Sequence, residues 1–225
     1  MDTTYSHQRT DHFGVPDEPR PVVMILSGPS GVGKDSALDA LEKLGVTFHR
    51  VVTATTRPPR PDEVNGVDYH FVSMKRFAEM IENDELIEYA IVYGDYKGVP
   101  KSEIIEPLKS GVDVIMRVDV QGAETMSKKL PGAVTVFLTT SSEEELIERL
   151  RERKTDSEEQ IAIRIAHARK ELEELPKFQY AVVNRHDKLE ETARVLWAIL
   201  TATRARTDYK RVEIEPAEVL SSVME

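Results

Sequence analysis

The chain has 225 residues, of which 31% are charged and 40% hydrophobic, and its formal net charge is -10. This composition is typical of a soluble globular protein, and the negative charge disfavours general binding to nucleic acid or to anionic membranes. The sequence contains no cysteine, which excludes a disulfide scaffold and a thiolate site and is typical of the cytoplasm.

Both ends of the chain are predicted to be tails. Residues 1–20 are polar and partly acidic, so we expect disorder rather than a secretory signal or a transit peptide. Residues 208–225 are predicted as a C-terminal tail, which either extends or folds back. No stretch is apolar enough to cross a membrane. We therefore expect a cytoplasmic protein without membrane or nucleic-acid partners, either monomeric or dimeric.

The first predicted element is a strand that leads through a glycine-rich loop into a helix. Residues 22–26 are apolar, and apolar residues recur at helical spacing between 37 and 44. The intervening loop has the form G-x-x-x-x-G-K, whose backbone N–H groups and lysine bind the phosphates of a nucleotide. We expect the following loop residues to bind ATP: Gly28, Pro29, Ser30, Gly31, Val32, Gly33, Lys34 and Asp35.

Asp35 occupies the position where this loop normally carries the Ser or Thr that binds magnesium. One interpretation is that its carboxylate positions hydrated Mg²⁺, a cation that prefers oxygen ligands. The alternative is that Asp35 only interacts favourably with the positive end of the helix. The next residue, Ser36, is rotated by about 100° around the helix and cannot simply replace it.

Further along the chain, strands and helices are predicted to alternate. The apolar runs 112–118, 133–140 and 180–184 are typical of buried strands, and helical patterns follow each of them. Ser141 or Ser142 is expected to cap the helix after the second run. This alternation predicts an α/β fold, in which a parallel sheet is covered by helices on both faces. The predicted core comprises residues 21–52, 99–152 and 176–207.

Two segments interrupt the alternation. Residues 53–98 contain short β-prone pieces and many turn residues, which indicate a small, mostly-β insertion. Residues 153–175 are highly charged with an apolar helical stripe, which predicts a helical lid hinged near Thr155. Because ligands bind at the carboxyl ends of parallel strands, both appendages are expected to close over one cleft.

Three motifs closely resemble the guanylate kinase family, which transfers a phosphoryl group from ATP to GMP. They are "TATTRPPRPDEVNGVDYHFVS", "ELIEYAIVYGDYKG" and "RVDVQGA", and the resemblance extends over about residues 22–203. The loop "GVGKD" and the segment "YGDYKGVPK" are most similar to the plastid and cyanobacterial type. The resemblance implies a P-loop NTPase core with a GMP-binding insertion and a helical lid over residues 21–207.

Arg57 and Arg60 offer two guanidinium groups for a monophosphate, although two arginines alone could form an ordinary surface patch. The resemblance implies that Tyr69 also reaches this phosphate. Lys97 stands where the family usually has a tyrosine, and we expect it to act there as a point charge. Val99 stands where the family usually has a Ser or Thr, and it cannot donate a hydrogen bond.

The resemblance also assigns the remaining site residues. Glu88 and Asp119 are expected to recognise guanine, with Thr53 near the guanine oxygen. Arg153 and Arg164 of the lid are expected to approach the ATP phosphates, and Asn184 to lie near adenine. A solvated charged hairpin is the alternative for the lid. The expected catalytic residues are Lys34, Arg60, Arg153 and Arg164.

The implied reaction is the Mg²⁺-assisted, in-line transfer of a phosphoryl group from ATP to GMP, and also to dGMP, in purine nucleotide metabolism. One rival interpretation is a ribose bisphosphate kinase, which would lack the guanine-binding residues. Another is a non-catalytic module for phosphopeptides, which would lack the loop lysine and the lid arginines.

Overall fold

The core of the protein is a five-stranded parallel sheet. The computed structural model describes residues 19–92, 94–152 and 158–215. The strands of the core sheet are β1 (Val23–Ser27), β2 (Phe48–Arg50), β7 (Asp113–Arg117), β8 (Val134–Thr139) and β9 (Tyr180–Val183). They are arranged in the order β2-β7-β1-β8-β9, and every neighbouring pair is parallel. The predicted parallel sheet is confirmed.

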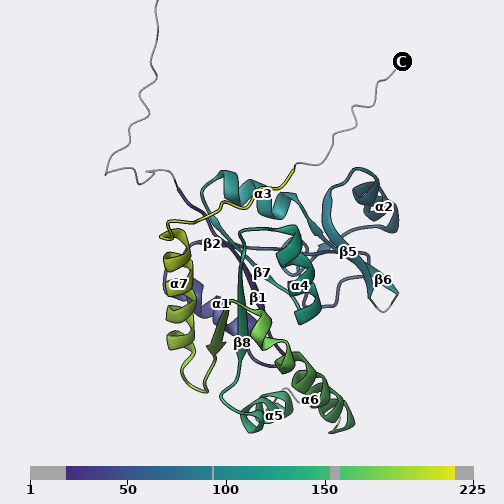
Figure 1. Cartoon of the computed structure of the whole chain (residues 1–225). Helices are drawn as coiled ribbons and strands as arrows, with labels where there is room; N and C mark the ends of the chain where they lie inside the picture. Colours follow the sequence, from purple (N-terminus) through teal and green to yellow (C-terminus); the bar gives the residue numbers. More distant parts are fainter. Residues whose placement is uncertain (1–18, 93, 153–157, 216–225) are drawn as a thin grey trace, which may run out of the picture.

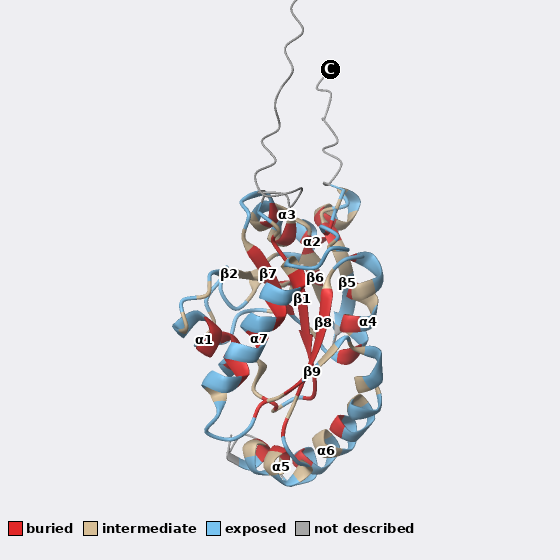
Figure 2. Cartoon of the chain, turned by 60° about the vertical axis from the view of Figure 1, so that its left-hand side comes forward, coloured by how far each residue is buried: buried red, intermediate tan, exposed pale blue. Residues whose placement is uncertain are grey.

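Helices cover both faces of this sheet (Figure 1). They are α1 (Lys34–Lys43) and α7 (Leu189–Arg204) on one face, and α3 (Ser102–Lys109) and α4 (Val120–Lys129) on the other. Successive residues of β1 point to opposite faces. Met24 and Leu26 accordingly pack with α1 and α7, whereas Val23 and Ile25 pack with α3 and α4. Figure 2 shows the resulting continuous buried interior along the central strands.

The predicted insertion forms a second, smaller sheet. Its strands are β3 (Ala54–Thr55), β4 (His70–Phe71), β5 (Leu86–Val92) and β6 (Asp95–Pro100), in the order β4-β3-β6-β5. It also contains the helix α2 (Met74–Glu82), which the sequence analysis did not predict. The hydroxyl of Ser73 caps this helix by accepting a hydrogen bond from the N–H of Arg76. The buried residues of the helix are Phe77 and Met80.

The predicted lid follows the carboxyl end of β8, just as the insertion follows the carboxyl end of β2. It contains α5 (Glu143–Glu152) and α6 (Glu158–Glu173), followed by the short helix η1 (Leu175–Lys177). Because the core strands are parallel, both appendages follow strand ends that lie at the same end of the sheet. Ser142 caps α5, since its hydroxyl accepts a hydrogen bond from the N–H of Glu145. The predicted hinge at Thr155 lies outside the described residues.

The chain after α7 returns to the core. Val212 is buried, and the hydroxyl of Tyr209 donates a hydrogen bond to the carbonyl of Pro21 at 2.7 Å. Arg211 donates to the carbonyl of Leu108 at 2.8 Å. Residues 208–215 of the predicted C-terminal tail therefore pack against the body. Among the described helices, none combines the length and apolar character needed to span a membrane.

One carboxylate connects the core to the insertion. Glu103 of α3 accepts hydrogen bonds from the N–H of Val52 at 2.8 Å and from the Nε2 atoms of His49 and His70, each at 2.7 Å. Burial by itself would raise the pKa of Glu103, but these hydrogen bonds outweigh it and the pKa lies below its ordinary value. His49 belongs to β2 and His70 to β4, so one side chain holds the two sheets together.

We expect Glu103→Gln to lower the free energy of unfolding by about 1–3 kcal/mol near neutral pH, the range for disrupted hydrogen bonds of a largely buried charged group. Because the pKa of Glu103 is lower in the folded state, its stabilisation is present above the unfolded pKa and disappears as the pH falls through the folded value. Urea titrations of both proteins should therefore converge below about pH 4. The control is Glu106→Gln, an exposed residue of the same helix. A difference that is independent of pH would contradict the prediction.

Candidate functional site

The glycine-rich loop has a backbone that only glycine adopts readily. Gly28 has a φ of 133°, and a Cβ atom there would lie 2.0 Å from the carbonyl oxygen of Leu138. Gly33 precedes α1 with a φ of 88°. Lys34 begins the helix, and its ammonium donates to the carbonyls of Gly28 at 2.5 Å and Pro29 at 3.2 Å. The lysine therefore folds back over the predicted phosphate-binding loop.

A hydrogen-bond network connects this loop to β9, α5 and α7. Asn184, at the end of β9, donates from its amide to the carbonyl of Val32 at 2.8 Å and accepts from the hydroxyl of Thr192 at 3.1 Å. Arg149 of α5 donates to the same Val32 carbonyl at 3.0 Å and to the carbonyl of Asn184 at 2.7 Å. The sequence analysis missed Arg149. The available signal was its i,i+4 spacing from Glu145, with which it forms an ion pair.

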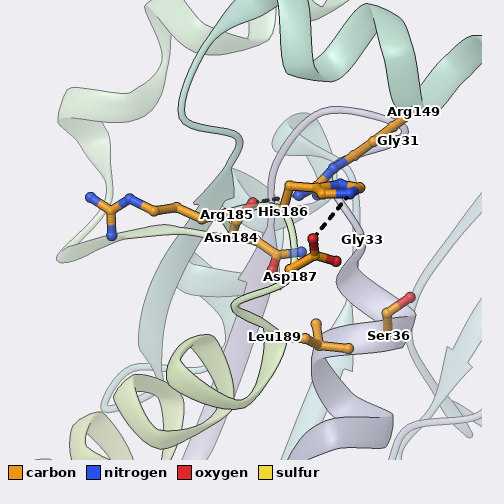
Figure 3. Close-up of a pocket in the computed structure, with 9 residues that line it drawn as sticks. All are labelled: Gly31, Gly33, Ser36, Arg149, Asn184, Arg185, His186, Asp187 and Leu189. Carbon is orange, nitrogen blue, oxygen red and sulfur yellow. Dashed lines mark hydrogen bonds and ion pairs between the residues drawn. The ribbon is translucent and has the colours of Figure 1, made fainter.

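An open pocket of about 440 Å³ lies beside the loop (Figure 3). The loop, α1, α5 and the connection from β9 to α7 contribute its lining: Gly31, Gly33, Ser36, Arg149, Asn184, Arg185, His186, Asp187 and Leu189. Figure 3 shows Arg185 extending away from the others, whereas the Nε2 atom of His186 lies 3.5 Å from a carboxylate oxygen of Asp187. Asn184 thus lines the pocket that adjoins the phosphate loop.

Asp35, in the first turn of α1, has a charged partner. Its carboxylate forms an ion pair with the guanidinium of Arg117, the last residue of β7. Burial lowers the pKa of Arg117. The sequence analysis did not consider Arg117, because it lies far from the loop in the sequence.

A cluster of cationic and aromatic side chains lies in the insertion. The guanidinium of Arg57 lies 5.3 Å from the ring centre of Tyr69, and the ammonium of Lys97 lies 5.4 Å from the same ring. Glu63 accepts a hydrogen bond from Arg57 at 2.8 Å and another from the backbone N–H of Arg60 at 2.7 Å. The hydrogen bond from Arg57 is the main reason that the pKa of Glu63 is lowered. The structure therefore brings Arg57, Tyr69 and Lys97 together, while Arg60 is exposed at their edge.

One acidic residue of the insertion and one of the core are close enough to interact electrostatically. Glu88 lies on β5, and Asp119 precedes α4, where its Oδ1 atom accepts a hydrogen bond from the N–H of Gly122 at 2.7 Å. The Oε2 atom of Glu88 is buried and has no hydrogen-bond partner within the described part of the chain. Burial raises the pKa of Glu88, and the charge of Asp119 adds to this effect against that of Lys129. An unpaired buried carboxylate oxygen is costly unless a ligand supplies a donor.

The structure also places Thr53, which was predicted to contact guanine, and Val99, which departs from the usual family residue. Thr53 precedes β3 and is partly buried, and its backbone carbonyl accepts a hydrogen bond from the N–H of His70 at 2.9 Å. Val99 of β6 pairs with Glu88 in the sheet and packs against the hydrophobic core. Because Val99 is apolar, it cannot donate a hydrogen bond to the carboxylate of Glu88, whose Oε2 atom is unpaired.

Helix α6, in the predicted lid, contacts the glycine-rich loop directly. Arg164 donates a hydrogen bond to the hydroxyl of Ser30 at 3.1 Å. Glu171 on the same helix is partly buried, and burial raises its pKa while the charge of Lys34 opposes the shift and that of Asp119 adds to it. The sequence analysis did not single out Glu171 within its charged run. Arg153, the other predicted lid arginine, lies outside the described residues.

The fold and the site together define a P-loop nucleotide-binding protein. The glycine-rich loop joins the central strand β1 to helix α1. The ammonium of Lys34 donates hydrogen bonds to carbonyls of this loop. A second, separate group of cationic residues lies in the insertion. These two positions suit a transfer reaction between two phosphorylated ligands.

Comparison with known proteins specifies the family. The guanylate kinase family model matches residues 19–203, and the chain therefore belongs to this family. Guanylate kinase 2, chloroplastic/mitochondrial, of Oryza sativa subsp. japonica is 43% identical over 197 residues, which cover 87% of this chain and 69% of that protein. Guanylate kinase of Gloeobacter violaceus is 44% identical over 178 residues, covering 79% and 86%.

A solved structure agrees with the assignment. The crystal structure of guanylate kinase from Anaplasma phagocytophilum superimposes with a TM-score of 0.63 at 29% identity, covering 84% of this chain and 89% of that one. The predicted resemblance to the plastid and cyanobacterial type is confirmed by the plant and cyanobacterial relatives.

Proposed function

We propose that this protein is a guanylate kinase that phosphorylates GMP, and also dGMP, with ATP to form GDP or dGDP and ADP. The single observation that carries the substrate assignment is the buried, unpartnered Oε2 atom of Glu88 beside Asp119. Guanine presents an N1–H and an amino group side by side, and both donate to a carboxylate. Adenine presents an acceptor at N1, which would leave the carboxylate unpaired and repelled.

The insertion supplies the binding site for the acceptor phosphate. Arg57 and Lys97 contribute positive charge, and both lie against the ring of Tyr69, whose hydroxyl can donate a hydrogen bond. Arg60 at the edge of the cluster would reach the phosphoryl group during transfer. Thr53 would contact the guanine oxygen. The guanine base would then lie against the core, with Glu88 and Asp119 at its edge.

The core and lid supply the binding site for ATP. The loop N–H groups and Lys34 would hold its phosphates, and the adjoining pocket would take the adenosine. Arg164, already seated on Ser30, and Arg153 would stabilise the transferring group. Asn184 maintains the loop through Val32 and forms the pocket wall. Since the GMP phosphate is itself an anionic nucleophile, an oxygen of this phosphate attacks the γ-phosphorus, ADP leaves, and no general base is required.

The residues at the loop fit Mg²⁺. Asp35 presents a largely exposed carboxylate at the first turn of α1, and Mg²⁺ is commonly held by one or two carboxylates together with substrate phosphates and water. Within the described ranges, no group of three acidic, His or Cys side chains would hold a metal by itself, so binding would depend on the nucleotide. Bound Mg²⁺ neutralises charge on the phosphates, and Asp35 would orient its water shell.

An assay of ADP release tests the assignment. We expect turnover of ATP with GMP and with dGMP, and none above background with AMP or ribose bisphosphate. Release of ADP with ribose bisphosphate but not with GMP would identify a ribose bisphosphate kinase. Binding of GMP without any turnover would identify a non-catalytic binding module. Either result would overturn the proposal.

We expect Arg57→Ala to raise the Kd for GMP about 10- to 100-fold, the range for losing a charge-assisted hydrogen bond. Calorimetric titration of GMP measures this effect. The matched control is Arg76→Ala, which removes an arginine of the same insertion that pairs with Glu85. Equal GMP affinity in wild type and Arg57→Ala would refute the role of Arg57.

We propose a cytoplasmic location, supported by the absence of cysteine. The rice relative is named chloroplastic/mitochondrial, and cell fractionation distinguishes these compartments. Recovery of the protein only with organelles would refute the proposal.

A further inference from the structure

The ion pair between Asp35 and Arg117 places two opposite charges where a P-loop normally carries a neutral hydroxyl. Asp35 directly follows Lys34, so its carboxylate lies near the phosphates that the loop is proposed to bind. A carboxylate in this position would repel nucleotide phosphates in the absence of metal. The guanidinium of Arg117 is positioned to cancel that repulsion.

The backbone holds Arg117 in this position. Arg117 ends β7, which is the direct neighbour of β1, and it is in register with Leu26. The N–H of Val118 then donates a hydrogen bond to the carbonyl of Leu26 at 3.2 Å. Both strands therefore end together at the edge where the phosphate loop begins. Arg117 is held beside Asp35 by the sheet rather than by a flexible loop.

The exposure of the pair argues against a role in stability. The side chain of Asp35 is 64% exposed and that of Arg117 is 37% exposed. Exposed ion pairs contribute little to folding because water and salt screen them. The same partial exposure leaves room for a ligand to approach both charges.

We propose that Arg117 is a positioning residue that neutralises Asp35 and thereby sets how strongly nucleotide binding depends on Mg²⁺. This inference rests on the nucleotide binding proposed for the loop. Without metal, Arg117 compensates the charge of Asp35 and permits the phosphates to bind. With metal, the cation supplies the compensating charge, and the contribution of Arg117 becomes small.

Titration of ADP into the full-length protein, with Mg²⁺ or with EDTA, tests this role. We expect Arg117→Met to raise the Kd of metal-free ADP about tenfold, equivalent to about 1.4 kcal/mol, and to change the Kd of Mg-ADP by less than about threefold. Arg117→Lys should restore most of the metal-free affinity, because it restores the charge. In the Asp35→Asn background, Arg117→Met should have less than about a threefold effect on metal-free ADP, since no carboxylate remains to be neutralised.

An equal loss in both backgrounds would show that Arg117 contacts the phosphates directly, and no loss in either would show that the pair is irrelevant to binding; both results overturn the proposal. Absence of ADP binding by the wild type would instead refute the proposed function. The control is Arg50→Met, which removes an arginine paired with Asp39 and Glu42 of the same helix α1 and should leave both Kd values unchanged.

Discussion

Replacing Lys34 with methionine should lower kcat for GMP phosphorylation by about 10²- to 10³-fold, the range for removing one preorganised group that stabilises developing charge. Lys34 starts α1, and its ammonium lies over the carbonyls of Gly28 and Pro29. This position places the cation where the outer phosphates of ATP are expected to bind. Methionine is unbranched and nearly as long as lysine but carries no charge, so the rate reports mainly the electrostatic contribution.

Steady-state kinetics with saturating ATP and GMP measure this effect. The control is Lys43→Met, since Lys43 is exposed in the last turn of the same helix; its kcat should match the wild type. Thermal unfolding of Lys34→Met should remain cooperative, which separates a loss of catalysis from a loss of fold. A kcat within about threefold of the wild type would contradict the proposed role of Lys34.

Glu88→Gln is expected to lower kcat/KM for GMP by about 10²-fold, near the upper limit for hydrogen bonds to a charged group. Glutamine keeps one acceptor but places an amide N–H₂ group against the donors of guanine. The result should be specific to the base, so the Kd of ADP should not change. A matched control is Glu82→Gln, an exposed residue of α2 in the same insertion.

The same substitution should have the opposite effect on stability. Burial and the charge of Asp119 raise the pKa of Glu88, so its ionised form destabilises the folded protein above the unfolded pKa. We therefore expect Glu88→Gln to stabilise the nucleotide-free protein near neutral pH and to lose this advantage as the pH falls through the raised folded pKa of Glu88, so that the two proteins have equal stability by about pH 4. This pH dependence is opposite to that of Glu103→Gln. Urea titrations that show destabilisation at neutral pH would contradict the interpretation of Glu88 as a strained binding residue.

The sequence predicted the core well because its signals are local. Apolar runs marked β1, β7, β8 and β9, and the G-x-x-x-x-G-K pattern marked the phosphate loop. Helix α2 was not predicted, because many turn residues in the insertion obscured a nine-residue helix. Its signals were local as well, since Ser73 provides a cap and apolar residues recur at helical spacing.

The site was predicted unevenly. The residues implied by the family motifs, such as Arg57, Tyr69 and Lys97, do lie together. Asn184 was expected beside adenine, which stays a prediction; in the structure its amide donates to the carbonyl of Val32 in the glycine-rich loop. Arg149 was missed although it is spaced i,i+4 from Glu145, because its contacts with Val32 and Asn184 join segments that are distant in the sequence. Glu63 was missed although its partners Arg57 and Arg60 are close to it in the sequence.

The sequence by itself determined the alternation of strands and helices, the phosphate loop and the family, since each is encoded in residue type and spacing along a short segment. Only the tertiary structure decided that Asp35 pairs with Arg117, that Glu103 joins the two sheets, and that an oxygen of Glu88 is buried without a partner. These features depend on how distant segments pack. The free energies of charges and hydrogen bonds depend on burial and distance, and neither quantity can be read from the order of residues.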